Sequence, residues 1–156
     1  MTGKAPFERI VAEHGDVVWR VCRGLLPQHD AEDAWSETFL AAMQAWERFE
    51  GDRVRGWLAT IAHRKALDAL RAGAKVVLPP DGVPDRPVLD RGRDLDLWAA
   101  LAALPDAQRR SVVAHHLGGL PYTEVAELTG STPAAARKAA SDGVHRLRAL
   151  LTVEDA

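Results

Sequence analysis

The sequence predicts an all-α protein made of two small helical domains, and three observations lead to this prediction. Apolar residues recur at helical spacing over both ends of the chain. Segments typical of β-strands are nearly absent. The stretch 73–93 contains four prolines and three glycines, and proline lacks an amide donor and biases the preceding residue away from helix. We therefore expect helical domains over 1–72 and 94–156, joined by a linker over 73–93.

Three helices are expected in the N-terminal domain. The first covers 7–26 and ends before Pro27. The second covers 30–49, because the carboxylate of Asp30 can cap its first turn. The third covers 57–71 and follows a short charged loop, GDRVRG. On the second helix, the apolar stripe expected to face the core consists of Trp35, Phe39, Met43 and Trp46.

Four helices are expected in the C-terminal domain, over 94–104, 106–117, 122–129 and 132–151. Thr132 is a good N-cap, and Pro133 suits the first helical position. Ala126 is followed four residues later by Gly130, which is the spacing of a helix-turn-helix. A small residue lets the second helix cross closely, and glycine takes the positive-φ turn. Many helical hairpins share this spacing, so it does not establish DNA binding alone.

The charges of the chain are segregated rather than uniformly basic. The net charge is −2, so nucleic-acid binding would have to come from local patches or from a partner. Acidic residues gather within 30–37, and basic residues gather within 53–71 and 137–148. The last of these segments has four basic residues and one acidic residue, a net charge of +3.

Several classes of protein are disfavoured by the sequence. No apolar run approaches the roughly 18 residues of a membrane span, and the N-terminus lacks a signal-peptide core. The single cysteine, Cys22, fits a reducing cytoplasm, and we expect it to be buried. No P-loop or nucleophile elbow is present, and His115 and His116 lie on different helix faces without metal-ligand spacing. We therefore expect a cytoplasmic protein that is not an enzyme and needs no cofactor or metal.

Two motif blocks resemble a known family. Residues 30–71, DAEDAWSETFLAAMQAWERFEGDRVRGWLATIAHRKALDALR, resemble region 2 of bacterial RNA polymerase sigma factors of the extracytoplasmic-function (ECF) type. Residues 103–109, ALPDAQR, and 119–126, GLPYTEVA, resemble region 4 of the same family, as does the later RLR of 146–148. The two blocks occur in the right order and cover nearly the whole chain.

The chain departs from the family pattern at three places. Ser36 stands where the family usually has Gln, and His63-Arg64 stands where it usually has Arg-Asn. The last helix begins PAAARK (133–138) where the family commonly has a start like TVKSR. These departures bear on promoter sequence preference more than on polymerase binding.

The resemblance implies three binding surfaces. Core polymerase would contact one face of the second helix: Asp33, Glu37, Leu40, Gln44 and Glu47. The −10 promoter element would contact the loop and third helix: Arg53, Arg55, Trp57, His63, Arg64 and Lys65. The −35 element would contact the last helix: Thr132, Ala134, Ala135, Arg137, Lys138, Ser141 and His145. Each surface also has a plainer explanation: a solvated face, an Arg64–Asp68 ion pair, Trp57 in the core, or a last helix kept only for packing.

The partners implied by the resemblance are core RNA polymerase, through its β′ clamp helices and β flap, and promoter DNA. An anti-sigma factor that holds the two domains together is a further implied partner. Two other functions stay open at this stage. The chain could be a free-standing helix-turn-helix regulator that works without polymerase, or a sigma-like protein with weak promoter recognition that sequesters a partner. Neither alternative needs both an acidic second helix and a basic loop after it.

Overall fold

The computed structural model describes residues 5–74 and 93–154, and every regular element in these two ranges is a helix. The N-terminal half contains α1 (Phe7–Leu25), α2 (Gln28–Ala45), the 3₁₀ turn η1 (Trp46–Arg48) and α3 (Val54–Ala74). The C-terminal half contains α4 (Arg93–Ala102), α5 (Asp106–Val112), the π-helical turn η2 (Val113–Leu117), α6 (Tyr122–Thr129) and α7 (Pro133–Glu154). The all-α prediction is confirmed. Most of the predicted linker lies outside the described residues.

Local sequence signals placed the helix-turn-helix correctly. Gly130 ends α6 with φ of 66°, in the left-handed region that favours glycine. The hydroxyl of Thr132 accepts a hydrogen bond from the backbone N–H of Ala135 at 3.1 Å, which is the expected N-cap of α7. Pro133 is the first residue of α7, where its missing N–H costs nothing.

Three of the predicted helices differ from those in the structure. Asp30 lies inside α2 and does not cap it; Pro27, at φ −58°, precedes the helix, which has no side-chain cap. The third helix starts at Val54, three residues early. The single helix expected over 106–117 changes to π geometry at Val113, because the Gly118 N–H bonds to the Val113 carbonyl five residues back at 2.8 Å.

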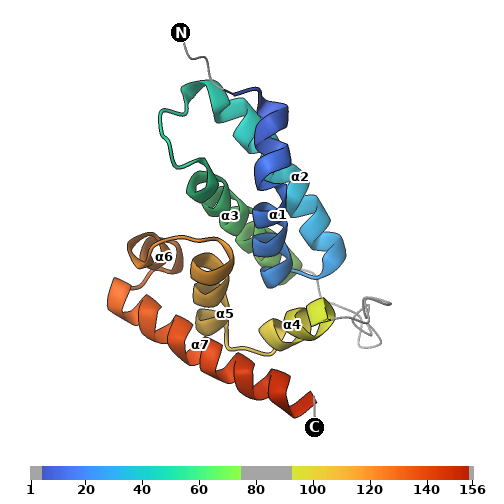
Figure 1. Cartoon of the computed structure of the whole chain (residues 1–156), viewed down its shortest axis with the longest axis vertical. Coiled ribbons are helices and arrows are strands. Elements are labelled where there is room, and N and C mark those ends of the chain that lie inside the picture. Colours follow the sequence, from blue (N-terminus) through green and yellow to red (C-terminus); the bar gives the residue numbers. More distant parts are fainter. Residues whose placement is uncertain (1–4, 75–92, 155–156) are drawn as a thin grey trace.

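The two halves pack on each other (Figure 1), and their buried apolar side chains form one continuous core. In Figure 1, α5 and α6 lie below and to the left of α3, α4 lies below α1, and α7 crosses beneath them. At Gly24 on α1, an added Cβ would lie 2.7 Å from a methyl of Val113, so only glycine allows this approach. The guanidinium Nε of Arg109 donates a hydrogen bond to the Gly24 carbonyl at 2.7 Å. The two halves of the sequence therefore share one core in this structure.

Cys22 lies at the centre of this core, as predicted. Its side chain has no exposed area, and burial raises the pKa of its thiol to about 12. Because the thiolate is the reactive form, this cysteine is shielded from thiol reagents in the folded chain.

Candidate nucleic-acid interface

The outer face of α2 has an apolar centre inside a polar rim. Leu40 and Met43 are 55% and 52% exposed, and they are the two exposed large hydrophobic residues among those described. The predicted contact residues around them, Asp33, Glu37, Gln44 and Glu47, are also exposed. Met43 was expected on the core stripe, and that expectation is wrong. The core side of α2 is instead formed by small residues and Phe39, which leaves Met43 on the outside.

An aromatic cluster supports the charged loop that follows α2. The rings of Phe49 and Trp57 stack with centroids 4.3 Å apart and planes at 22°. Trp46 continues the stack over Phe49 at 5.9 Å and 15°. A Cβ at Gly51 would lie 3.0 Å from the Phe49 ring, so the loop backbone also lies close to it. Trp57 is therefore half-buried: it belongs to the cluster and still lines the surface beside the loop.

Three of the six predicted −10 residues line a cavity between the two halves. Arg53, Trp57 and Arg64 line it from the loop and α3, and Glu124, Glu127 and Leu128 line it from α6; its volume is about 310 Å³. Arg53 Nη1 lies 3.2 Å from the Glu124 carboxylate, which joins the loop to α6. Arg55 lies beside Gly119, which has φ of 73°. The Arg64–Asp68 pair considered from sequence is not found; Asp68 contacts Arg71 at 3.9 Å instead.

The structure separates His63 from the other predicted −10 residues. Arg53, Arg55 and Arg64 are exposed and Lys65 is partly exposed, whereas His63 has no exposed area. Neither ring nitrogen of His63 has a hydrogen-bond partner. Burial, followed by the nearby cations Arg110 and Arg64, lowers the pKa of His63 to about 4. His63 can reach DNA only if the two halves separate, since its ring is enclosed in the packed chain.

Burial of neutral His63 predicts a loss of stability in mild acid. The folded pKa of about 4 lies below the unfolded value of 6.5, so the unfolded chain binds the proton more readily in this window. Stability should be complete above pH 6.5 and should fall by up to about 3 kcal/mol as pH approaches 4. Urea denaturation at several pH values measures this. A His63→Leu variant should lose that part of the slope, and an unchanged slope would contradict the assignment to His63.

All seven predicted −35 residues lie on the exposed face of the helix-turn-helix. Thr132, Ala134, Ala135, Arg137, Lys138, Ser141 and His145 are each exposed. Ala126, Ala136 and Ala140 are buried, and they let α6 and α7 pack closely. Asp142, whose negative charge would repel phosphate, forms an ion pair with Lys138 at 2.8 Å. This pair neutralises one cation of the helix in the free chain.

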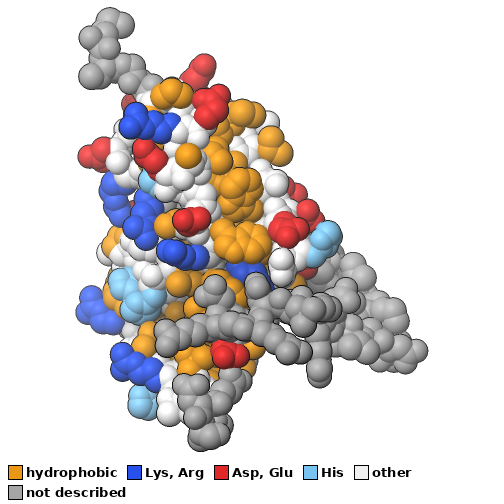
Figure 2. Space-filling view, turned by 45° about the vertical axis from the view of Figure 1, so that its right-hand side comes forward, with side chains coloured by type: hydrophobic (Ala, Val, Ile, Leu, Met, Phe, Trp, Pro, Cys, Tyr) orange, Lys and Arg blue, Asp and Glu red, His pale blue; other side chains and the backbone are white. Residues whose placement is uncertain are grey.

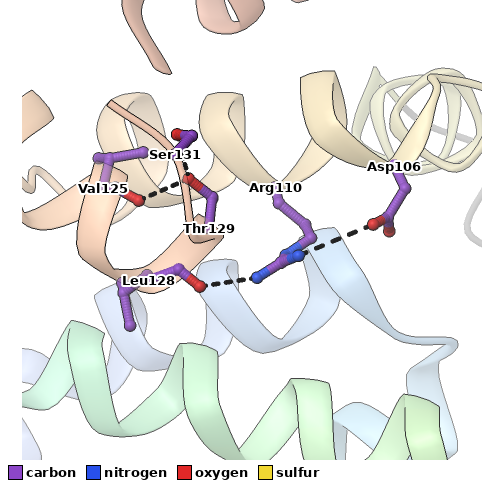
Figure 3. A network of polar contacts seen from close by, with 6 residues as sticks. All are labelled: Asp106, Arg110, Val125, Leu128, Thr129 and Ser131. Atoms are coloured by element: carbon purple, nitrogen blue, oxygen red, sulfur yellow. Dashed lines mark hydrogen bonds and ion pairs between the residues drawn. The ribbon is translucent and has the colours of Figure 1, made fainter. Parts of the chain in front are cut away.

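Arg110 on α5 holds the end of α6 (Figure 3). Its guanidinium donates a hydrogen bond to the Leu128 carbonyl at 2.8 Å and lies 3.8 Å from the Asp106 carboxylate. Thr129, the residue after Leu128, donates its hydroxyl proton to the Val125 carbonyl at 2.8 Å. The hydroxyl oxygen of Thr129 also lies 2.9 Å from that of Ser131. The Arg110 bond satisfies the Leu128 carbonyl, one of the carbonyl groups left free at the helix end. The contacts of Thr129 lie in the turn that sets the direction of α7.

Charge is segregated on the surface as well as along the sequence. On the face in Figure 2, most Lys and Arg side chains gather along the left edge, and apolar side chains form a stripe down the middle. Exposed basic residues are the groups that meet phosphate, and exposed apolar groups with a charged rim are typical of protein contacts.

Sequence reasoning missed the groups that join the halves. Two contacts join the halves: Arg53 with Glu124, 71 residues apart, and Arg109 with the Gly24 carbonyl, 85 residues apart. No pattern in the sequence pairs positions so far apart.

Among the residues that the structure describes, no helix is long and apolar enough to cross a membrane. Within the same ranges, no cluster of three or more His, Cys, Asp or Glu side chains could hold a metal ion.

Comparison with protein families gives matches over both halves. The model of Sigma-70 region 2 matches residues 10–76, and the model of Sigma-70, region 4 matches residues 94–147. Among characterised proteins, the sequence is 35% identical to the RNA polymerase sigma factor CarQ of Myxococcus xanthus, covering 93% of this chain and 88% of that protein. It is 30% identical to the ECF RNA polymerase sigma factor SigE of Mycolicibacterium smegmatis, covering 91% of this chain but 60% of the relative.

Two solved structures share the arrangement of helices. CnrH, solved in complex with the cytosolic domain of CnrY, aligns with a TM-score of 0.65 and 25% identity over 94% of this chain and 88% of CnrH. The sigma factor RpoE of Bartonella quintana, solved with the anti-sigma factor NepR, aligns with a TM-score of 0.71 and 22% identity over 94% and 97%. The second likeness bears on the fold alone.

Proposed function

The chain belongs to the sigma-70 family of RNA polymerase sigma factors, and from this membership we propose how its surfaces divide the work of an ECF-type alternative sigma factor. Its partners are core RNA polymerase and promoter DNA, and its role is in transcription initiation rather than in enzymatic catalysis. The observation that carries the proposal is the presence of both region 2 and region 4, in order, in one chain. A free-standing regulator is not favoured, because it has no use for region 2.

The outer face of α2 is the proposed contact with core polymerase. Leu40 and Met43 supply an apolar centre that is desolvated on binding, and such centres carry most of the energy of a protein interface. The rim of Asp33, Glu37, Gln44 and Glu47 orients the encounter with basic groups of the β′ clamp helices. The β flap is the proposed partner of the region 4 half.

The loop and the start of α3 form the proposed −10 surface. Arg53, Arg55, Arg64 and Lys65 provide cations for phosphate, and Trp57 provides an aromatic surface at the cavity beside them. Unstacked bases of an opened promoter need both kinds of group. We propose His63 as a positioning residue of this surface, because its ring is buried behind Arg64 rather than on the surface.

The exposed face of α7 is the proposed −35 surface. The N-terminal end of the second helix of a helix-turn-helix enters the major groove, and the small side chains of Ala134 and Ala135 allow close approach there. Arg137 and Lys138 are the first residues of α7 able to reach phosphate or a guanine edge. The work is shared with polymerase and the −10 surface, so contacts at −35 need not be strong.

The two halves are proposed to act as separate units, with boundaries at 1–72 and 94–156 and a linker at 73–93. CnrH was solved in complex with the cytosolic domain of CnrY, which supports a protein partner for this chain as well, and we propose that this partner is an anti-sigma factor. A protein that works with RNA polymerase on the bacterial chromosome works in the cytoplasm, and that is the proposed location.

Transcription by the reconstituted enzyme tests this function. Purified core polymerase with and without the chain is supplied with fragmented genomic DNA of the source organism. Discrete new run-off transcripts that share upstream elements are expected. The Leu40→Glu variant places a charge at the apolar centre of α2 and should abolish the transcripts and weaken polymerase binding more than tenfold, with melting temperature unchanged. Exposed Ala149→Glu on α7 is the matched control. Binding to neither polymerase nor promoter would refute the function.

A further inference from the structure

Four side chains form a column across the helix-turn-helix. The ring of His115 lies parallel to the ring of Tyr122, with centroids 3.9 Å apart and planes at 15°. His116 contacts His115 edge-on at 4.8 Å and 83°. On Tyr122, the guanidinium carbon of Arg137 lies 5.3 Å from the ring centroid. The column thus runs from η2 through the first residue of α6 to the exposed face of α7.

The base of this column is fixed by backbone geometry. His115 Nδ1 lies 2.8 Å from the carbonyl oxygen of Leu120, and because a carbonyl only accepts, Nδ1 carries the proton and donates it. The turn between them is closed by two further bonds, from Gly119 N–H to the His115 carbonyl at 3.0 Å and from Leu120 N–H to the Ala114 carbonyl at 3.1 Å. Gly119 takes φ of 73°, which this turn requires. The His115 ring therefore has a set position.

At the other end of the column lies Arg137, and the position of its guanidinium matters for DNA binding. Arg137 is exposed on α7, and a free arginine side chain loses considerable rotamer entropy when it is ordered by a ligand. An aromatic face attracts a guanidinium and holds it flat against the ring. Tyr122 starts α6, the first helix of the motif, which crosses the phosphate backbone in helix-turn-helix complexes. A guanidinium held there is directed at the backbone beside the groove.

We infer that Tyr122, supported by His115, is a positioning residue that presents Arg137 to a phosphate of the −35 element. This inference rests on the proposed function, since it assigns Arg137 a partner on promoter DNA. It also gives a role to His115, which supports the other face of the column. The two neighbouring cations are held differently in the free chain: Lys138 pairs with Asp142 at 2.8 Å, whereas the guanidinium of Arg137 lies over the Tyr122 ring.

A double-mutant cycle in the holoenzyme tests the inference. The probe is a promoter fragment recovered in the transcription assay, titrated with holoenzyme at several salt concentrations. Tyr122→Leu removes the aromatic face and should weaken binding about two- to fivefold. Tyr122→Phe keeps the face and should bind like the wild type. In an Arg137→Gln background, Tyr122→Leu should cost nothing further, and the salt slope should already be lower by about one phosphate contact.

Two results of the cycle would overturn the inference. An equal loss from Tyr122→Leu with and without Arg137 would assign Tyr122 a packing role only and overturn the inference. A loss from Tyr122→Phe as large as that from Tyr122→Leu would also overturn it. NMR of the free chain tests the contact of Arg137 with the Tyr122 ring in the absence of DNA. Ring-current shifts of the Arg137 δ protons should persist in Tyr122→Phe and vanish in Tyr122→Leu. If wild-type holoenzyme binds no promoter fragment, the proposed function itself fails, whatever the NMR shows.

Discussion

Replacing Gly143 with alanine should destabilise the chain by about 2 kcal/mol, although the same change stabilises most helices. Alanine in a helix interior is favoured over glycine by about 1 kcal/mol. At Gly143, however, the added Cβ would lie 2.6 Å from a methyl of Val112 and 3.3 Å from the backbone oxygen of Gln108. Val112 is buried and β-branched, so α5 and α7 must move apart to make room. Leucine at this position should cost more still.

Gly73 provides the matched control for this prediction. It also lies in a helix, α3, but an added Cβ there would meet nothing within 4 Å. Gly73→Ala should therefore stabilise the chain by up to about 1 kcal/mol. Chemical denaturation measures both variants. A Gly143→Ala variant as stable as Gly73→Ala would show that α5 and α7 do not pack as closely as described.

The sign of the Gly143 effect shows what a sequence can and cannot predict. Thr132, Pro133 and Gly130 act within a few residues of their partners, so the turn of the helix-turn-helix was predictable. From sequence alone, Gly143 is only a weak point in a helix. The reason that glycine is needed at this position lies on α5, more than 30 residues away, where Val112 leaves no room for a side chain. Packing between elements of this kind carries no local signal.

The candidate site likewise has a part that could be predicted from the sequence and a part that could not. The faces of α2 and α7 follow from helical periodicity, and the predicted residues there are exposed as a contact surface requires. Met43 and His63 were misplaced for opposite reasons. Small residues on α2 form its core side and leave Met43 outside, whereas the region 4 half covers α3 and leaves His63 inside. Periodicity gives the faces of a helix, but it does not say which faces a second domain covers.

For one chain to contact both promoter elements, as proposed, its packed halves must separate. Elements at −10 and −35 are about 25 base pairs apart, or about 85 Å of straight duplex at 3.4 Å per pair. A compact chain of 156 residues has an expected radius of gyration of about 15 Å, and so a diameter of about 40 Å. The described structure cannot contact both elements. The 18 residues between Ala74 and Arg93 can span at most about 60 Å, enough with the two halves to cover the distance.

Fluorescence energy transfer should therefore fall from high to low when the holoenzyme binds its promoter. Dyes on Ala12→Cys in α1 and Ala149→Cys in α7, both exposed positions, report the distance between the halves. Cys22 does not interfere, because it is buried and the pKa of its thiol is raised to about 12. A pair on Ala12→Cys and Ala72→Cys, within the first half, should stay constant.

Opening breaks specific contacts, and this makes the prediction sharper than a change in distance alone. Separation frees Arg53 from Glu124 and Arg109 from the Gly24 carbonyl, and it exposes the apolar contact of Val113 with Gly24. The Arg53–Glu124 ion pair is exposed and contributes little to holding the halves together. The contacts around Gly24, which are the Arg109 hydrogen bond and the apolar contact with Val113, therefore supply more of that free energy. Glu124→Gln should leave energy transfer in the free chain nearly unchanged, whereas Gly24→Leu should lower it without polymerase. Unchanged transfer in a wild-type complex that transcribes would mean that the halves never separate, and the assignment of both promoter elements to this one chain would be wrong.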